Sequence, residues 1–281
     1  MSARDYEDAA PLSATERRLV ALCERINENP GAKNLQTRFH KLVSRRWIAL
    51  CTSNLLEVRG LAHARDLESS NGVLVCSNHR SFFDMYVLFA VLRNERLPWL
   101  RDVYFPVRST FFYEQWAGLA VNLLMGGGAM YPPIFRDPDR AVALNKVSVE
   151  RIVRFLRTPG VAVGMHPEGT RGKGPDPYDL LPAQPGVGQM AVQGGAPVLP
   201  VWVNGLSNDM PRQILSNFRS GANRGERIVV SIGAPVDLGD LRAERARLTV
   251  YKRAADRILD AIRALGERER ARDSAAAGNG A

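Results

Sequence analysis

VLVCSNHRSFFDMYVLF, residues 73–89, joins two apolar runs through a short polar break. The first run, with Gly72 in front of it, spans residues 72–77 and has the length and β-branched content of a buried strand. Residues 82–93 have helical spacing. Asn78 and His79 stand at the break, and Asp84 follows the histidine. The stretch therefore predicts a strand, a turn that carries a histidine, and a helix.

His79 and Asp84 allow two interpretations. Ser81 and Asp84 have capping-box spacing, so Asp84 could simply cap the helix. On one continuous helix, residues five apart point about 140° away from each other and do not meet. If His79 lies in the turn instead, its ring can fold back onto the carboxylate. An aspartate that holds one ring nitrogen frees the other as a base near neutral pH. The pattern alone leaves both interpretations open.

The rest of the chain repeats the alternation of short apolar runs and helical stretches. Further strands are expected at 161–165, 197–203 and 227–232. Helices are expected at 14–29, 35–57, 109–124, 139–157, 186–194 and 244–268. This order predicts the α/β class: a single domain with a mixed, largely parallel sheet flanked by helices, preceded by an N-terminal helical segment. The expected boundaries are disorder at 1–12, a helical, membrane-contacting segment at 13–65, the main domain at 66–266, and a disordered tail at 267–281.

Composition and charge limit the classes of partner that we expect the protein to bind. The net charge of +9 favours an anionic partner, such as nucleic acid, an anionic membrane surface or a phosphorylated substrate. No basic stripe with interleaved aromatic residues is present, so no nucleic-acid partner is expected. Three cysteines without a CxxC pair indicate a reducing compartment, and the N-terminus has no apolar core of the signal-peptide kind.

Two stretches could contact a membrane. Residues 35–57 mix basic and apolar residues at helical spacing, as in an interfacial helix, although a surface helix packed on the core has the same pattern. Residues 115–135 carry no charge, but Gly126–Gly128 and Pro132-Pro133 interrupt them. The interrupted stretch predicts a short helix, a turn and an extended segment rather than a membrane span. We expect a peripheral or monotopic protein at the cytoplasmic face of the membrane.

A second polar motif follows the strand at 161–165. It reads His166-Pro167-Glu168-Gly169-Thr170-Arg171, in the longer run HPEGTRGKG. The glycines allow backbone amides to approach a ligand, and Arg171 can bind a phosphate with two parallel hydrogen bonds. Taken alone, the motif is more typical of a polar turn with an exposed arginine.

Together the two motifs resemble the glycerolipid acyltransferase family, of which lysophosphatidic acid acyltransferase is the best-known member. The resemblance rests on NHRSFFD at 78–84 and PEGTR at 167–171. It extends to the block that ends in Arg136 and to GGAPVLPVWVNG at 194–205, and covers about residues 70–235.

The resemblance implies an enzyme, an O-acyltransferase of phospholipid biosynthesis, that moves a fatty acyl group from acyl-CoA or acyl carrier protein to a lysophospholipid. Lysophosphatidate would become phosphatidate, without a metal and without a cofactor beyond the acyl thioester as co-substrate. His79 would be the general base and Asp84 would orient it. Arg136, Glu168, Gly169, Thr170 and Arg171 would bind the acceptor.

The chain departs from the family pattern at two places. His166 stands where the family has an apolar residue, either as a packing substitution or as a change to the acceptor site. Gln184-Pro185 stands where the family has lysine, which raises the alternative of a different lysolipid or polar acceptor. A thioester hydrolase that uses the same His79–Asp84 pair to activate water is a further alternative, as is a non-catalytic, basic membrane-binding protein.

Overall fold

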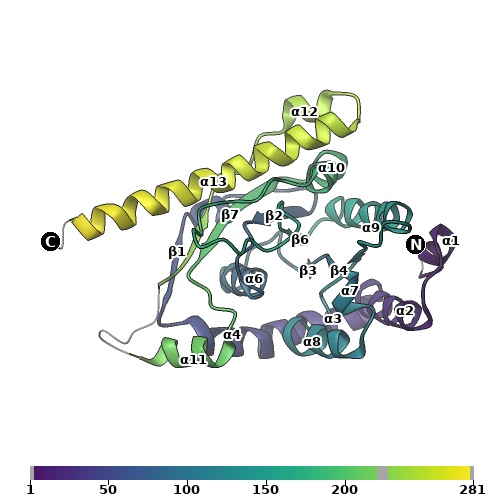
Figure 1. Ribbon diagram of the computed structural model, residues 1–281, viewed down its shortest axis with the longest axis horizontal. Helices are drawn as coiled ribbons and strands as arrows, with labels where there is room; N and C mark the ends of the chain where they lie inside the picture. Colours follow the sequence, from purple (N-terminus) through teal and green to yellow (C-terminus); the bar gives the residue numbers. More distant parts are fainter. Residues whose placement is uncertain (1–2, 220–226, 279–281) are drawn as a thin grey trace.

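A six-stranded sheet forms the centre of the computed structural model, which describes residues 3–219 and 227–278 (Figure 1). The strand order is β1-β8-β7-β2-β6-β3, and every neighbouring pair is parallel except β7 with β8. The strands are β1 (Leu56–Arg59), β2 (Val73–Ser77), β3 (Asp102–Tyr104), β6 (Val161–Met165), β7 (Val198–Asn204) and β8 (Ile228–Ile232). A separate parallel pair joins β4 (Val107–Arg108) to β5 (Pro133–Ile134). The expected mixed, largely parallel sheet is confirmed.

Helices cover both faces of the sheet, which explains why its central strands are apolar throughout. β2 and β8 are buried along their whole length. One face carries α9 (Ala141–Leu156), α10 (Pro185–Gly194), α12 (Gly239–Ala243) and α13 (Leu248–Gly278), drawn above the sheet in Figure 1. The other face carries α6 (Asp84–Asn94), with an outer layer below it (Figure 1). That outer layer includes α3 (Pro30–Phe39), the π-helical segment η1 (His40–Ser44), α4 (Arg45–Thr52), α8 (Trp116–Gly126) and α11 (Met210–Phe218).

The N-terminal helices are bound to the domain through a buried arginine. Arg151 of α9 is fully buried and forms ion pairs with Asp5 of α1 (Ala3–Ala9) and with Glu24 and Glu28 of α2 (Ala14–Glu28). Tyr6 is also fully buried, and its ring lies under the Arg151 guanidinium. The prediction that residues 1–12 are disordered is therefore wrong for the described part, because α1 supplies an aromatic ring and a carboxylate to this cluster.

Three further boundaries differ from the expectations. The helical run expected at 35–57 begins at Pro30, passes through η1 and ends at Thr52, and Leu56–Arg59 forms strand β1. Because β1 pairs with β8, the expected boundary at residue 65 cuts through the sheet. The tail predicted to be disordered from residue 267 continues α13 to Gly278, where Glu269 and Asp273 form ion pairs with Arg227.

The uncharged stretch at 115–135 folds as predicted into a helix, a turn and an extended segment. α8 ends at Gly126, and Gly127 and Gly128 have positive φ angles of 55° and 85°, a conformation that favours glycine. The extended part leads into β5. The helix expected at 109–124 is broken into α7 (Ser109–Phe112) and α8. Among residues 3–219 and 227–278, no helix combines the length and the hydropathy needed to cross a bilayer.

Candidate active site

The two polar motifs meet because they follow neighbouring parallel strands. β2 leads into Asn78-His79 and β6 leads into His166–Arg171, and in the sheet register Cys76 lies opposite Met165. Parallel strands have their carboxyl ends at the same edge of the sheet, where ligands of open α/β folds bind. Motifs 80 to 90 residues apart in sequence therefore form one site.

Asn78 fixes the point at which the chain leaves β2. Its side chain is fully buried, with Oδ1 accepting from Val203 N and Nδ2 donating to Val203 O, each at 2.8 Å. The Asn78 side chain thus adds two hydrogen bonds between the end of β2 and β7. The asparagine of the motif anchors the loop that carries His79.

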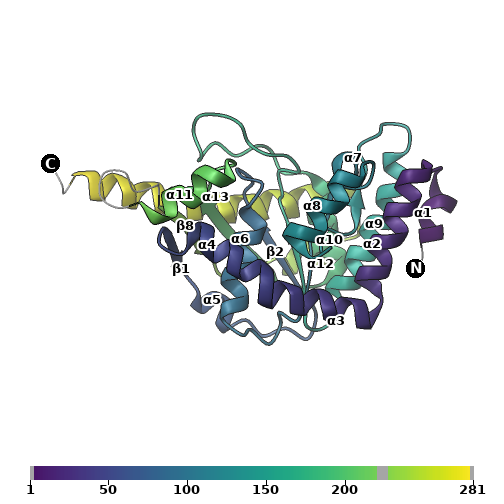
Figure 2. The ribbon, with the colours of Figure 1, turned by 90° about the horizontal axis from the view of Figure 1, so that it is seen from below.

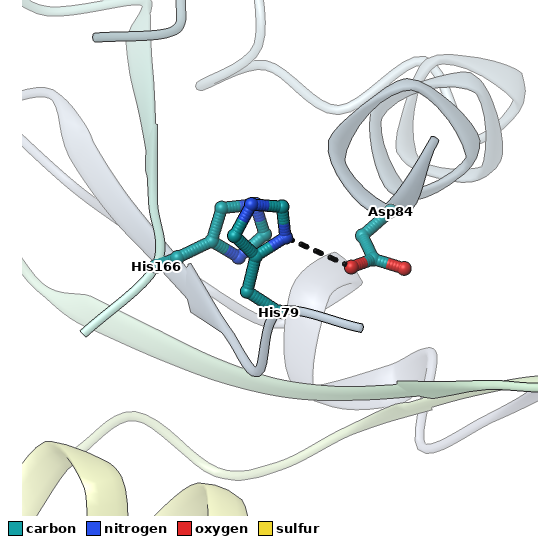
Figure 3. Close-up of side chains that lie close together, drawn as sticks. All are labelled: His79, Asp84 and His166. Atoms are coloured by element: carbon teal, nitrogen blue, oxygen red, sulfur yellow. Dashed lines mark hydrogen bonds and ion pairs between the residues drawn. The ribbon is translucent and has the colours of Figure 1, made fainter. Parts of the chain in front are cut away.

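His79 and Asp84 meet as one of the two interpretations predicted. His79 Nδ1 lies 3.2 Å from Asp84 Oδ2, and the Asp84 side chain is 1% exposed (Figure 3). The same oxygen accepts from the backbone N–H groups of Arg80 and Ser81, each at 2.8 Å. Asp84 therefore orients the imidazole and also caps the turn before α6, so the two interpretations are not alternatives. The helix begins at Asp84, two residues later than the capping box predicted.

The second motif holds the backbone of His79 from both sides. The buried Glu168 carboxylate accepts from His79 N through Oε1 and from Leu181 N through Oε2, each at 2.8 Å. The backbone N–H of Gly172 donates to His79 O at 2.9 Å. Glu168 thus faces the protein backbone, whereas the sequence suggested a contact with the acceptor.

His166 lies flat against His79. The ring centroids of His166 and His79 are 3.8 Å apart and the two planes differ by 6° (Figure 3). His166 Nδ1 lies 3.0 Å from the carbonyl oxygens of Ser77 and Asn78, so Nδ1 carries the proton and donates to them. The histidine that departs from the family pattern therefore contacts His79 directly.

Burial sets the protonation of the pair. Desolvation, together with the nearby Arg171 and Arg108, lowers the pKa of His79 to about 4, although a hydrogen bond with the backbone of Ser81 acts in the opposite direction. Desolvation raises the pKa of Asp84 to about 6, although His166, two backbone N–H groups and Arg171 act in the opposite direction. At neutral pH, His79 is an uncharged imidazole beside a carboxylate, which is the state that a general base requires.

Three arginines surround the open side of the site. Arg171 Nη1 donates to Asn208 Oδ1 at 2.8 Å, and Arg136 Nη2 donates to Gly169 O. The side chains of Arg108, Arg136 and Arg171 are all exposed. Arg108, which the sequence analysis did not single out, lowers the pKa values of both His79 and Arg136, so it lies close to each. No motif in the sequence marks Arg108 as part of the site.

The remaining predicted residues lie in the same loop. Gly169 is exposed, with φ of 67°, and Thr170 is half-buried beside it. Gln184, which stands in place of the family lysine, donates its backbone N–H to Pro167 O at 2.8 Å. A Cβ atom on Gly169 would lie 3.0 Å from Gln184 Cγ, so Gln184 is a direct neighbour of the loop.

His79, Asp84 and His166 offer three possible metal-ligand atoms within 4.8 Å of one another. The two imidazole planes are nearly parallel, so their in-plane lone pairs do not converge on one ion at the tetrahedral angles that zinc prefers. His166 Nδ1 is also occupied by backbone carbonyls. The arrangement fits a base with its supports better than a metal centre.

Residues 56–204 match the family model described as Acyltransferase, which is more than half of the chain. The chain belongs to the acyltransferase family. The expected enzyme class, an O-acyltransferase, is thereby confirmed. The match begins at β1 and ends at the last residue of β7, so it covers both motifs and the strands that carry them.

Curated relatives carry one enzyme name. The chain is 24% identical over 214 residues to the 1-acyl-sn-glycerol-3-phosphate acyltransferase of Salmonella typhimurium, which covers 73% of this chain and 74% of the relative. It is 30% identical over 144 residues to the human 1-acyl-sn-glycerol-3-phosphate acyltransferase beta, which covers 51% and 45% of the two chains. The crystal structure of the 1-acyl-sn-glycerophosphate acyltransferase PlsC from Thermotoga maritima aligns with 88% of this chain and 91% of its own, at 16% identity and a TM-score of 0.48.

Proposed function

We propose that this acyltransferase moves a fatty acyl group from an acyl thioester to the free hydroxyl of lysophosphatidate, giving phosphatidate. The observation that carries the proposal is the His79–Asp84 pair, because His79 Nδ1 is engaged by the buried carboxylate and Nε2 is left as the proton acceptor. The names of the relatives in Salmonella typhimurium and in humans support the same acceptor.

The reaction needs no covalent enzyme intermediate. His79 Nε2 takes the proton of the acceptor hydroxyl as its oxygen attacks the thioester carbonyl carbon. The C–S bond then breaks, and the proton passes from His79 to the sulfur, which leaves as a free thiol. Asp84 stabilises the imidazolium that forms between the two steps. Either acyl-CoA or acyl carrier protein would serve as donor.

The acceptor phosphate would bind to the three arginines. Arg108, Arg136 and Arg171 are exposed cations beside the base, and a guanidinium binds phosphate in a bidentate manner. Gln184 brings no charge to the position where the family has lysine, which keeps a different lysolipid among the alternatives.

We propose that the outer helical layer contacts an anionic bilayer from the cytoplasmic side, as a peripheral or monotopic surface. Exposed apolar side chains gather on α3, η1, α4, α8 and α11, which lie together below the sheet in Figure 1 and face the viewer's side in Figure 2. This exposed apolar face consists of Leu35, Leu42, Val43, Leu50, Trp116, Leu123, Leu124, Leu215 and Phe218. Exposed apolar patches often mark membrane or protein contacts.

Charge on the same layer supports a membrane partner. Arg38, Lys41, Arg45 and Arg46 are exposed, and residues 30–52 contain no aspartate or glutamate. Each basic residue at an anionic surface contributes about 1 kcal/mol of attraction. Trp47 is not part of this face, because its ring packs against Phe83 and Tyr86, and Trp116 of α8 is the exposed tryptophan.

The proposal is tested by acyl transfer from a labelled acyl-CoA, and in parallel from an acyl carrier protein thioester. The acceptors are lysophosphatidate, glycerol 3-phosphate, lysophosphatidylglycerol and none, with wild type and His79→Ala compared. Diacyl product that needs lysophosphatidate and His79 supports the proposal. Transfer to another acceptor corrects the substrate. Thiol release without an acceptor that still needs His79 indicates the hydrolase, and turnover that is indifferent to His79→Ala rejects His79 as the base.

A further inference from the structure

The resemblance to the family gives no role to the ring of His166. His166 follows β6 and packs flat on His79, with ring centroids 3.8 Å apart and planes within 6° (Figure 3). Asp84 reaches the same imidazole at its edge, 3.2 Å from Nδ1. Asp84 therefore restrains the His79 ring within its plane, and His166 restrains movement of that ring out of the plane.

His166 is itself held firmly. Its Nδ1 lies 3.0 Å from the carbonyl oxygens of both Ser77 and Asn78 and 3.3 Å from Ser77 Oγ. The two carbonyls mark the point where the chain leaves β2, and they fix the Nδ1–H tautomer of His166. A phenylalanine could present a flat face here, but it could not bond to these carbonyls.

Neutral His166 also suits the charge that develops during transfer. Burial and the neighbouring His79 keep the pKa of His166 far below its ordinary value. His166 thus stays uncharged while His79 becomes an imidazolium, and the face of an uncharged aromatic ring attracts a cation stacked on it. The charged groups around the ring pair are Asp84 of α6, Glu168 and Arg171 of the second motif, and Arg108 at the end of β4.

We propose that His166 is a positioning residue for the base: its ring, hydrogen-bonded to the end of β2, holds His79 so that Nε2 points at the acceptor hydroxyl. This inference rests on the proposed function, because it gives His166 its part in the same acyl transfer. A role at the base replaces both possibilities that the sequence left open for His166, which were simple packing and a change to the acceptor site.

The kinetic test compares His166→Ala, His166→Phe and, as the matched control, His63→Ala, since His63 is exposed on α5 (Ala62–Arg65). His166→Ala should lower kcat about 10- to 100-fold, the loss that a misplaced catalytic group produces, with KM nearly unchanged. His166→Phe keeps the flat face but cannot bond to the carbonyls of Ser77 and Asn78, so it should recover only part of the activity. The acid limb of the pH–rate profile should move to higher pH in His166→Ala only, because water then reaches His79.

An NMR measurement detects the stacking of His166 on His79 independently of catalytic activity. The chain has four histidines, so four single substitutions assign every imidazole signal in an NMR spectrum. We expect His166 to be the Nδ1–H tautomer and the ring protons of His79 to be shifted upfield, a shift that His166→Ala removes. Wild-type kcat and an unmoved acid limb in His166→Ala would overturn the proposal, as would the absence of the upfield shift in wild type. A His166→Ala variant that loses only thermal stability, with unchanged kcat in the folded fraction, would do the same.

The two proposals fail in different ways. If wild type transfers no acyl group to any acceptor, the proposed function fails, while the NMR spectrum still reports the stack and its tautomer. If transfer depends on His79 but not on His166, the proposed function stands and the positioning role is rejected.

Discussion

The backbone N–H of His79 donates to the Oε1 atom of Glu168 at 2.8 Å, across 89 residues of sequence. The other carboxylate oxygen of Glu168 accepts from Leu181 N, and Gly172 N donates to His79 O. The loop after β6 therefore holds the main chain of His79, while Asp84 and His166 contact its ring. The second motif therefore supports the backbone of the first motif, in addition to any contact that it makes with the substrate.

Glu168→Gln should distinguish a role of Glu168 in holding the His79 backbone from a role in binding the acceptor. An amide offers only one oxygen, so its NH2 group would face a backbone N–H, and an unmade hydrogen bond at a buried group costs about 1–3 kcal/mol. We expect a lower melting temperature and a lower kcat, with KM for the acceptor nearly unchanged. Glu150→Gln on the exposed side of α9 is the control. A raised KM at unchanged kcat would return Glu168 to the acceptor-binding role that the sequence suggested.

We expect His79→Ala and Asp84→Asn to lower kcat by different amounts. His79→Ala removes the base, and general-base catalysis is worth about 10²- to 10⁴-fold. Asp84→Asn keeps an oxygen for the N–H groups of Arg80 and Ser81, so the fold should persist while the imidazole loses its charged partner. Steady-state kcat and circular dichroism on both variants check this expectation. Full activity in Asp84→Asn would show that Asp84 only caps the turn before α6.

The activity should fall on the acid side and stay level through neutral pH. Burial lowers the pKa of His79 to about 4 and raises that of Asp84 to about 6. As pH falls, Asp84 takes up a proton first and stops supporting the imidazolium, and then His79 itself becomes protonated. Because the two groups interact, kcat/KM should show an apparent pKa between these values that belongs to the pair. A limb at the ordinary histidine pKa, near about 6.5, would mean that water solvates His79.

The sequence predicted the parts of the site that depend on local pattern. The turn at His79, the helix after it and the loop at Glu168–Arg171 all follow from runs of residues next to each other. The parts that it missed depend on long-range register. The contact of His166 with His79 follows from the register that places Cys76 opposite Met165. Arg108 lies opposite Ile134 in the β4–β5 pair, two residues before Arg136.

The parts of the fold that the sequence analysis missed, strand β1 and helix α1, also depend on long-range contacts. β1 has four half-buried residues that continue a helical pattern, so no local signal separates it from the helix before it. The order of α1 depends on Arg151, more than a hundred residues away. Contacts of this kind override local propensity, and one sequence without relatives does not contain them.

The arginines should govern the affinity for the acceptor. Arg108→Ala, Arg136→Ala and Arg171→Ala should each raise KM for lysophosphatidate about tenfold or more, since a charge-assisted hydrogen bond contributes about 1.5–3 kcal/mol. The largest effect is expected at Arg171, which Asn208 already holds in place. Arg253→Ala on the exposed side of α13 is the control. If none of the three variants changes KM, the acceptor phosphate binds elsewhere.

The exposed apolar face should control binding to membranes. Leu42→Asp and Leu124→Asp alter side chains that are 59% and 69% exposed, so neither change should unfold the protein. Burying a leucine in a membrane contributes about 1.5–3 kcal/mol, and about 1.4 kcal/mol corresponds to a tenfold change in partitioning. Each variant should therefore bind phosphatidylglycerol vesicles about tenfold or more weakly in a sedimentation assay.

Leu248→Asp is the matched control, because Leu248 is 68% exposed but begins α13 on the opposite face of the sheet (Figure 1). Arg45→Gln and Arg46→Gln should weaken binding to anionic vesicles but not to neutral ones, and added salt should reduce the difference, because screening weakens charge attraction. The activity of the leucine variants on a short-chain, water-soluble thioester and acceptor should be unchanged, since His79 and Asp84 lie in the inner layer. If Leu248→Asp weakens vesicle binding as much as Leu42→Asp does, the membrane contacts the opposite face of the molecule.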